Sequence, residues 1–147
     1  MPTGDATGAV SPGVVWHDGA VSRDERAAVT GGRGMVVWFT GLSGSGKSSV
    51  AVELERQLIS SGRAAYVLDG DNLRHGLNGD LGFSSRDRGE NVRRVGEVAA
   101  LLADSGTVAL VPLVSPYRDD RDRVRRRITS AGLDFLQHRL CTRGFEK

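Results

Sequence analysis

The chain of 147 residues and 15.7 kDa has the size of one ordinary domain. A chain of about 150 residues can bury roughly 70% of the surface that its unfolded form exposes. A composition of 39% hydrophobic and 26% charged residues excludes wholesale disorder. No run approaches the ~20 apolar residues of a membrane span, and residues 1–13 lack the apolar core of a signal peptide. We therefore expect a globular domain that has no membrane partner.

The ionisable residues argue against a nucleic-acid partner. Twenty basic and 18 acidic residues leave a net charge of only +2, and aromatic residues are 5% of the chain. The arginines are interleaved with acidic residues, and those at 125–127 suit the C-terminal end of a solvated helix. The one cysteine, Cys141, excludes an intrachain disulfide and a cysteine zinc cluster. This cysteine usage indicates a reducing compartment, which predicts a cytoplasmic location.

The first predicted elements follow a leader without periodicity at residues 1–13. Ser22 and Glu25 have the spacing of a capping box, in which each side chain bonds the backbone of the other residue. This spacing predicts a short helix over residues 23–29. The continuous apolar run at 35–39 predicts a strand that is buried on both faces.

The rest of the chain alternates between helical and extended patterns. It predicts a helix over residues 48–60 with Val50, Leu54 and Leu58 on its inward stripe, a second buried strand over 64–68, a helix over 90–103, a third strand over 107–111, a helix over 119–130 and a fourth strand over about 133–136. Such alternation predicts an α/β domain with a parallel sheet flanked by helices. Because ligands bind beyond the carboxyl ends of parallel strands, we expect function in the loops after Phe39, Leu68 and Val111.

The first of these loops contains a phosphate-binding motif. Residues 41–48 satisfy G-x-x-x-x-G-K-[ST] directly after a predicted strand and at the start of a helix. Glycines let backbone N–H groups approach phosphate oxygens, Lys47 places its charge on the β- and γ-phosphates, and the Ser48 hydroxyl ligates magnesium. A glycine-rich turn with a chance lysine is the alternative. We predict binding of a nucleoside triphosphate with Mg²⁺ by Gly41, Leu42, Ser43, Gly44, Ser45, Gly46, Lys47 and Ser48.

Polar residues also follow the second and third strands. Asp69 and Asp71 place two carboxylates where they can bind magnesium or accept a hydroxyl proton during phosphoryl transfer. The alternative is an Asp/Gly turn in which Asn72 caps a short helix, and the neighbouring P-loop favours the functional interpretation. Ser115 lies just past the third strand, where it can contact substrate, carry a phosphoryl group or simply form a turn.

The stretch at 74–91 is too polar and too rich in glycine for a core element. Its arginines, Phe83 and Asn91 suit an anionic ligand with a flat ring, through charge, stacking and hydrogen bonds respectively. The alternative is a surface loop in which Phe83 plugs the core, and the residues alone favour this second interpretation.

These motifs together resemble the adenylyl-sulfate kinase (APS kinase) family. The motifs are GLSGSGKSS at 41–49, LDGDNLR at 68–74, GLNGDLGFS at 76–84, DRGENVRR at 87–94 and SPYR at 115–118, with VWHDG at 15–19 similar to the entry segment of bacterial members. The resemblance runs from about residue 14 to about 135. It implies a P-loop nucleoside triphosphate hydrolase fold and transfer of the ATP γ-phosphate to the 3′-hydroxyl of adenosine 5′-phosphosulfate (APS). The product is the activated sulfate donor 3′-phosphoadenosine 5′-phosphosulfate.

The resemblance also implies roles for single residues. The implied catalytic residues are Asp71 as the base, Asp69, Lys47 and Ser115; the implied metal ligands are Ser48 and Asp69; the implied substrate-binding residues are Arg74, Phe83, Arg88 and Asn91. Ser115 matches a serine described in the family as a phosphoserine intermediate. In-line transfer from ATP needs positioning and charge neutralisation, so it does not require such a carrier.

The resemblance ends near Phe135, since residues 136–147 contain no recognisable lid, last strand or last helix. We therefore expect a C-terminally truncated fold with a flexible leader at 1–13, a kinase-like domain at 14–135 and a divergent tail at 136–147. A lid excludes water and supplies cations, so a non-catalytic ATP-binding remnant is one alternative function. Another P-loop kinase, for gluconate or a nucleoside monophosphate, is a second. In the tail, His138 and Cys141 are too few ligands for a metal site.

The resemblance implies partners as well. ATP and Mg²⁺ are the implied cofactors, and APS is the implied small-molecule partner. Because members of the family are often dimeric, a homodimer is a candidate assembly. Association with a sulfate-adenylylating enzyme is a further candidate.

Overall fold

The structure, a computed structural model, describes residues 10–140 of the chain. Its elements are α1 (Arg23–Thr30), β1 (Met35–Thr40), α2 (Lys47–Ser60), β2 (Ala65–Val67), α3 (Gly70–Leu73), α4 (Ser85–Asp104), β3 (Val108–Pro112), α5 (Arg118–Ser130) and β4 (Asp134–Arg139). The strands form one sheet in the order β2-β3-β1-β4, and every pair is parallel. The predicted α/β fold with a parallel sheet flanked by helices is confirmed. Cys141 and most of the predicted tail lie outside the described residues.

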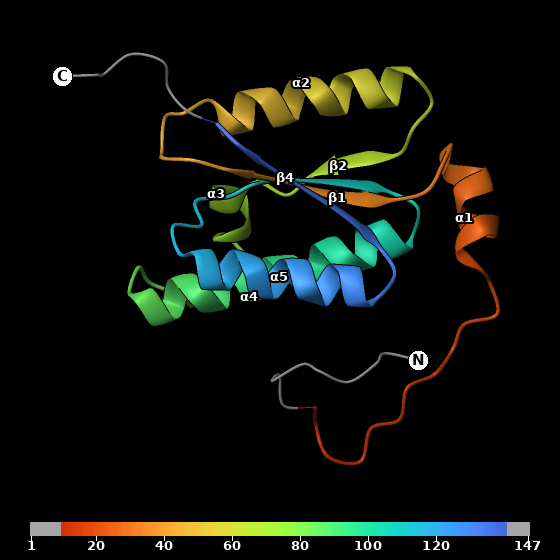
Figure 1. The fold of residues 1–147 in the computed structure, drawn as a ribbon, viewed down its shortest axis with the longest axis horizontal. Helices are drawn as coiled ribbons and strands as arrows, with labels where there is room; N and C mark the ends of the chain where they lie inside the picture. The colour runs from red at the N-terminus through yellow and green to blue at the C-terminus, as the bar shows by residue number, and fades with distance from the viewer. Residues whose placement is uncertain (1–9, 141–147) are drawn as a thin grey trace.

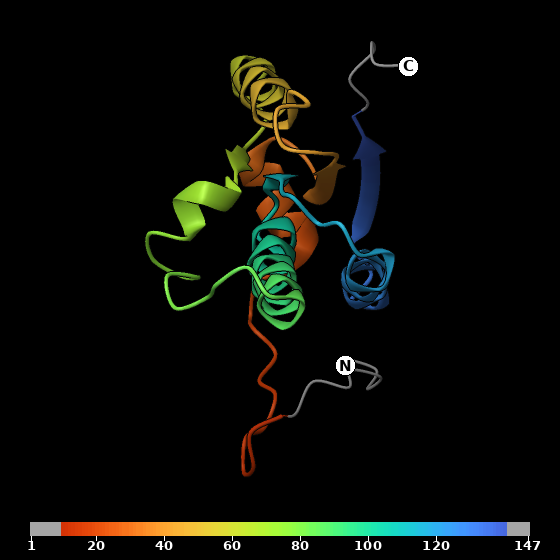
Figure 2. The same cartoon turned by 90° about the vertical axis from the view of Figure 1, so that its left-hand side faces the viewer.

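The sheet is the middle layer of three (Figure 1). Helix α2 covers one face, and α4 with α5 covers the other, as Figure 2 shows from the side. On the α4 and α5 side, Trp38 packs in a core that includes Val95 and Ile128. On the α2 side, Val37 and Phe39 pack against Ala51. The alternation of β1 side chains between two cores explains why its sequence is apolar throughout.

Helix α1 begins at the predicted capping box. The Ser22 hydroxyl accepts a hydrogen bond from the Glu25 backbone at 3.1 Å, and the Glu25 carboxylate accepts one from the Ser22 backbone at 2.6 Å. These bonds satisfy two of the donors that a helix N-terminus leaves without partners. Arg23 and Arg26 then tie α1 to Asp104 at the end of α4, at 2.7 and 3.1 Å.

Several predicted elements differ from the structure. The second strand is not buried: β2 has three residues at the edge of the sheet, and the Tyr66 side chain is 58% exposed. Helix α4 begins at Ser85 rather than near residue 90, because the Ser84 hydroxyl caps it by accepting from the Asp87 backbone at 3.1 Å. On α2, Ala51 is buried while Val50 is exposed, since the helix turns its smallest side chain toward the sheet.

Strand β4 extends farther than the predicted fourth strand. It continues to Arg139, in parallel register with β1 from Met35↔Asp134 to Thr40↔Arg139. The polar residues at 137–139 hid this extension, because an edge strand keeps backbone pairing on one side while its side chains face solvent. The extension carries the chain to the same end of the sheet as the P-loop.

Candidate active site

The polar loops gather at the carboxyl ends of the strands (Figure 1). The P-loop follows β1, Asp69 follows β2, Ser115 follows β3, and Arg139 ends β4. A parallel sheet brings these points to one edge although they are up to about a hundred residues apart in the chain. The loops in which the sequence predicts function therefore lie together at the carboxyl ends of the strands.

The P-loop has the backbone that close approach to an anion requires. Gly46 caps α2 with a left-handed φ of 91°, a conformation that favours glycine. A Cβ built at Gly46 would meet nothing within 4 Å, so the space over the loop is open. The N-terminus of α2 therefore faces free space, and its N–H groups are placed to bind phosphate oxygens. The residues present fit the polyphosphate of ATP.

Lys47 folds back over the same loop. Its ammonium group donates to the carbonyl oxygens of Gly41 at 2.9 Å and Leu42 at 2.7 Å, and lies 3.4 Å from the Ser45 hydroxyl. The residue is only 7% exposed, and burial lowers the pKa of its ammonium below the ordinary value. Burial removes water from the ammonium group, and neutral carbonyls do not balance its charge. Binding of an anion therefore stabilises the buried cation.

Ser48 and Asp69 connect the P-loop to the loop after β2. The Ser48 hydroxyl donates to Asp69 Oδ2 at 3.1 Å. Hydroxyl and carboxylate oxygens are ligands that Mg²⁺ prefers, and beside bound phosphates the ion keeps several waters. The chemistry of the pair therefore fits a magnesium ion.

Asp69 also organises the short helix that follows it. Its Oδ1 accepts from the backbone N–H groups of Asp71 at 3.0 Å and Asn72 at 3.1 Å, so Asp69 rather than Asn72 is the cap of α3. Asp71 lies in the first turn of α3 and is exposed to solvent. One carboxylate is thus fixed by three hydrogen bonds while its neighbour stays accessible.

The predicted substrate-binding residues come together beyond α3. The Arg74 guanidinium lies 4.3 Å above the ring of Phe83 and donates to the Leu81 carbonyl at 3.0 Å. Arg88 donates to the Phe83 carbonyl at 2.9 Å from the first turns of α4. Phe83 is 70% exposed, so the alternative in which it plugs the core is wrong. An exposed ring beside the Arg74 guanidinium, with Arg88 bonded to the same residue, suits a flat, anionic ligand.

Asn91 lies one helical turn beyond Arg88 on α4 and is buried. Within the described residues its Oδ1 has no hydrogen-bond partner. An unsatisfied buried acceptor costs free energy, so it is a position where a ligand donor is favoured.

Arg94 braces the loop that contains Leu77 and Asp80, a contact that the sequence motifs did not predict. It donates to Asp80 at 2.7 and 3.2 Å, to Glu90 at 2.9 Å and to the Leu77 carbonyl at 3.1 Å. Hydrogen bonds from Arg93 and Arg94 lower the pKa of Glu90 to about 2. Arg94 stands in the quoted DRGENVRR motif, but its partners are up to 17 residues away, so no local pattern identifies them.

Ser115 is buried beneath the edge of the sheet, at 1% exposure. Its Oγ accepts from the Trp38 indole N–H at 3.1 Å and lies 3.3 Å from the Leu113 carbonyl and 3.4 Å from the Thr40 hydroxyl. The hydroxyl is therefore engaged with the core as well as with the site. The bond between Trp38 and Ser115 couples the packing of β1 to the loop after β3.

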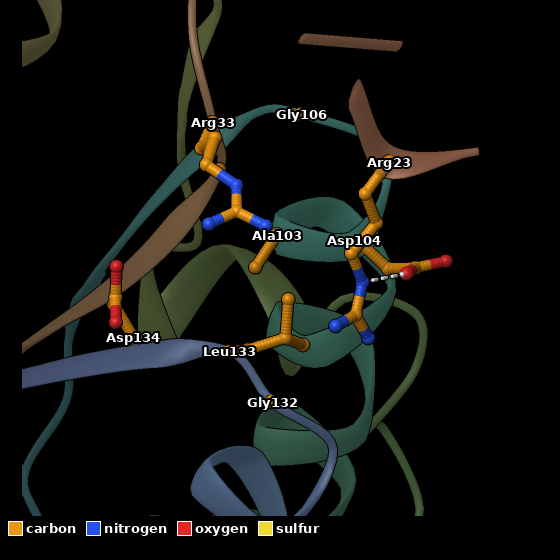
Figure 3. A pocket seen from close by; sticks show the side chains of 9 residues that line it. Arg23, Arg33, Ala103, Asp104, Gly106, Gly132, Leu133 and Asp134 are labelled. Carbon is orange, nitrogen blue, oxygen red and sulfur yellow. Dashed lines mark hydrogen bonds and ion pairs between the residues drawn. The ribbon is translucent and has the colours of Figure 1, made fainter. Parts of the chain in front are cut away.

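A cleft of about 490 Å³ opens beside the P-loop. It is lined by Thr40, Gly41, Leu42, Ser45, Val114, Ser115, Pro116, Arg121, Gln137, Arg139 and Leu140. A second cavity of about 40 Å³ lies at the opposite end of the sheet, near the amino ends of the strands and beside the ion pair of Arg23 with Asp104 (Figure 3). The second cavity has about the volume of one water molecule. Of these two cavities of residues 10–140, the larger has room for a group of a nucleotide.

Among residues 10–140, no group of three or more His, Cys, Asp or Glu side chains is placed to hold a metal ion by itself. The helices of the same segment are too short or too polar to cross a membrane. A magnesium ion at Ser48 and Asp69 would thus depend on ligands from the nucleotide.

Comparison with known proteins gives one consistent family. The model of the adenylylsulphate kinase family matches residues 33–140. The adenylyl-sulfate kinase of Staphylococcus carnosus is 55% identical over 115 residues, which are 78% of this chain and 58% of that protein. This chain therefore spans about three fifths of the length of that relative.

Solved structures agree with the sequence relatives. The APS kinase of Mycobacterium tuberculosis, solved in complex with AMPPNP and APS, is 59% identical with a TM-score of 0.73, over 74% of this chain and 63% of that chain. The hexameric APS kinase of Thiobacillus denitrificans is 38% identical with a TM-score of 0.68, over 84% of this chain and 26% of that chain. The family match covers more than half of the sequence and includes every loop described above. The chain belongs to the adenylylsulphate kinase family.

Proposed function

We propose that this chain binds MgATP and APS and transfers the γ-phosphate of ATP to the 3′-hydroxyl of APS. The observation that carries the proposal is the link between two binding sites. The P-loop bonds through Ser48 to Asp69, and Asp69 caps the helix that leads to Arg74 and Phe83. A triphosphate site and a site for an anionic, ring-bearing acceptor are thereby held beside each other, which is the arrangement that phosphoryl transfer needs.

The roles in this proposal follow from charge and accessibility. Lys47 and the P-loop backbone hold the polyphosphate, and Ser48 with Asp69 orients magnesium. Asp71 is exposed next to the fixed carboxylate of Asp69, so it is the better placed of the two to accept a hydroxyl proton. Arg74, Phe83, Arg88 and Asn91 bind APS through charge, stacking and hydrogen bonding. A related structure supports these ligands, since the APS kinase of Mycobacterium tuberculosis was solved with AMPPNP and APS.

Ser115 supports the site by position in this proposal, not as a covalent carrier. Its hydroxyl is buried and already bonded to the Trp38 indole at 3.1 Å. We expect Ser115→Ala to retain turnover at saturating substrates while lowering the free energy of unfolding by about 1–3 kcal/mol, since the indole N–H loses its acceptor. Steady-state kinetics and chemical denaturation measure the two effects. Loss of turnover in a variant that stays folded would support a phosphoserine intermediate.

The proposed activity is tested by ADP release in a coupled assay with APS, gluconate and AMP as acceptors. We expect ADP release that depends on APS and is absent with the other two acceptors. No APS-dependent release would overturn the proposal. Calorimetric binding of ATP without turnover would instead identify a nucleotide-binding member that lacks catalysis.

Partners and location remain part of the proposal. The related hexameric APS kinase supports a homo-oligomer, with a homodimer as the smallest assembly. The proposal also includes association with a sulfate-adenylylating enzyme and a cytoplasmic location, where ATP is present. Light scattering of the purified chain measures the assembly directly.

A further inference from the structure

We propose that Arg121 and Arg139 hold the terminal phosphate of the bound nucleoside triphosphate in the cleft beside the P-loop. This rests on the nucleotide binding of the proposed function and adds two residues that the sequence motifs did not assign. Neither residue belongs to the P-loop: Arg121 comes from α5, and Arg139 is the last residue of β4.

The lining of the cleft suits an oxyanion. Its two charged side chains are the guanidinium groups of Arg121 and Arg139, and no Asp or Glu is among the lining residues. Thr40, Ser45 and Ser115 add hydroxyl groups. Arginine binds phosphate through two parallel N–H groups, and such charge-assisted hydrogen bonds are stronger than neutral ones. The cleft therefore offers donors and positive charge without a competing carboxylate.

Arg121 is anchored but not fully satisfied. It donates from one guanidinium nitrogen to the Ser115 carbonyl at 2.5 Å. Its Nε is buried and has no hydrogen-bond partner among residues 10–140, and the side chain forms no ion pair there. A guanidinium that is positioned by one bond, with donors left over, is prepared for an incoming anion at little further entropic cost.

Arg139 is held close to the P-loop by the backbone of β4. Thr40 and Arg139 are register partners, and the Leu140 N–H donates to the Thr40 carbonyl at 2.8 Å. The strand end lies so near the loop that a Cβ at Gly41 would approach the Leu140 carbonyl to 2.6 Å. The Arg139 side chain is exposed and makes no hydrogen bond or ion pair with the described residues. Its charge is thus free to face the cleft that it lines.

The terminal phosphate is the group that this geometry selects. The P-loop backbone and Lys47 enclose the phosphates that lie over the start of α2. The cleft borders the loop at Gly41, Leu42 and Ser45 and extends toward the strand ends. Of the three phosphates of the nucleotide, only the terminal one extends beyond the P-loop toward the cleft. Cations at that position neutralise the charge on the transferring phosphoryl oxygens.

The test is calorimetric titration of the full chain with MgATP and MgADP. We expect Arg139→Gln to weaken MgATP binding about tenfold and MgADP binding less than twofold, because only ATP presents the extra phosphate. Arg121→Lys keeps the charge but loses the fork of donors, so the same selective loss is expected with a smaller size. Arg126→Gln is the matched control, since Arg126 is an exposed arginine of α5 that does not line the cleft. It removes the same charge and is expected to leave both affinities unchanged.

Other outcomes would overturn the assignment. Equal losses for MgATP and MgADP, or no loss for either, would show that these arginines do not hold the terminal phosphate. Weaker binding of APS with unchanged MgATP binding would assign the cleft to the sulfate side of the acceptor instead. Absence of MgATP binding to the unaltered chain would also overturn it. Because the readout is binding, a chain that binds ATP selectively but does not phosphorylate APS would reject only the proposed function.

Discussion

Lys47→Met is expected to weaken MgATP binding by about 100-fold and to abolish measurable phosphoryl transfer. A hydrogen bond to a charged group contributes up to about 3 kcal/mol, and 1.4 kcal/mol corresponds to a factor of ten in affinity. Lys47 lies over the open P-loop, 2.7 to 2.9 Å from two carbonyl oxygens that a phosphate would replace as its partners. Methionine keeps most of the chain length and removes the charge. Calorimetry with MgATP measures the effect.

The control for Lys47 is Ser49→Ala in the same first turn of α2. Ser49 is exposed and follows the motif, so the variant is expected to bind MgATP as the unaltered chain does. Thermal unfolding of both variants should stay close to that of the parent, since Lys47 bonds only to neighbouring loop atoms. An unchanged affinity in a folded Lys47→Met protein would contradict the assignment of the P-loop as the triphosphate site.

Trp38→Ala is expected to lower the free energy of unfolding by about 3–5 kcal/mol. Trp38 is completely buried between β1 and the helices α4 and α5, and its ring lies 6.3 Å from that of Phe135 on β4. Truncation leaves a cavity in the core beneath the sheet. The edge strand β4 packs on the same core, so it loses contacts as well. The substitution also removes the donor to Ser115, so the loop after β3 should loosen. Chemical denaturation gives the free energy, and hydrogen exchange reports the loop.

Two further variants separate packing from the hydrogen bond. Trp38→Phe keeps a ring but loses the indole N–H, so a smaller loss of stability with a similar loosening at Ser115 is expected. Leu101→Ala truncates an apolar side chain of α4 that is 70% exposed, and it should change stability by less than about 0.5 kcal/mol. A loss at Trp38 no larger than that at Leu101 would contradict the placement of Trp38 in the core.

The family and the P-loop conformation were predictable because their signals are local. The P-loop places eight consecutive residues around one turn, and the capping box that begins α1 lies within four residues. The alternation of apolar strands with helical patterns predicted the parallel sheet. Because the carboxyl ends of parallel strands meet at one end of a sheet, the same pattern also predicted that Asp69 and Ser115 lie near the P-loop.

The burial of individual segments was harder to predict from the sequence. The strand that contains Tyr66 is apolar enough to look internal, yet it lies at the sheet edge because strand order depends on pairing, not on composition. Phe83 looked suited to the core and instead lies exposed against Arg74. Each outcome depends on which distant segment arrives alongside, and a single sequence does not record that.

The sequence by itself therefore determined the phosphate-binding loop, the α/β layering and the family resemblance, since these depend on residues close together in the chain. The tertiary structure decided how the loops cooperate. It brought Trp38 to Ser115 across 77 residues and fixed the loop that contains Leu77 and Asp80 on Arg94. It also placed Arg121 and Arg139 in the cleft that borders the P-loop. Long-range backbone pairing and core packing set these distances, and such contacts leave no spacing rule in the sequence.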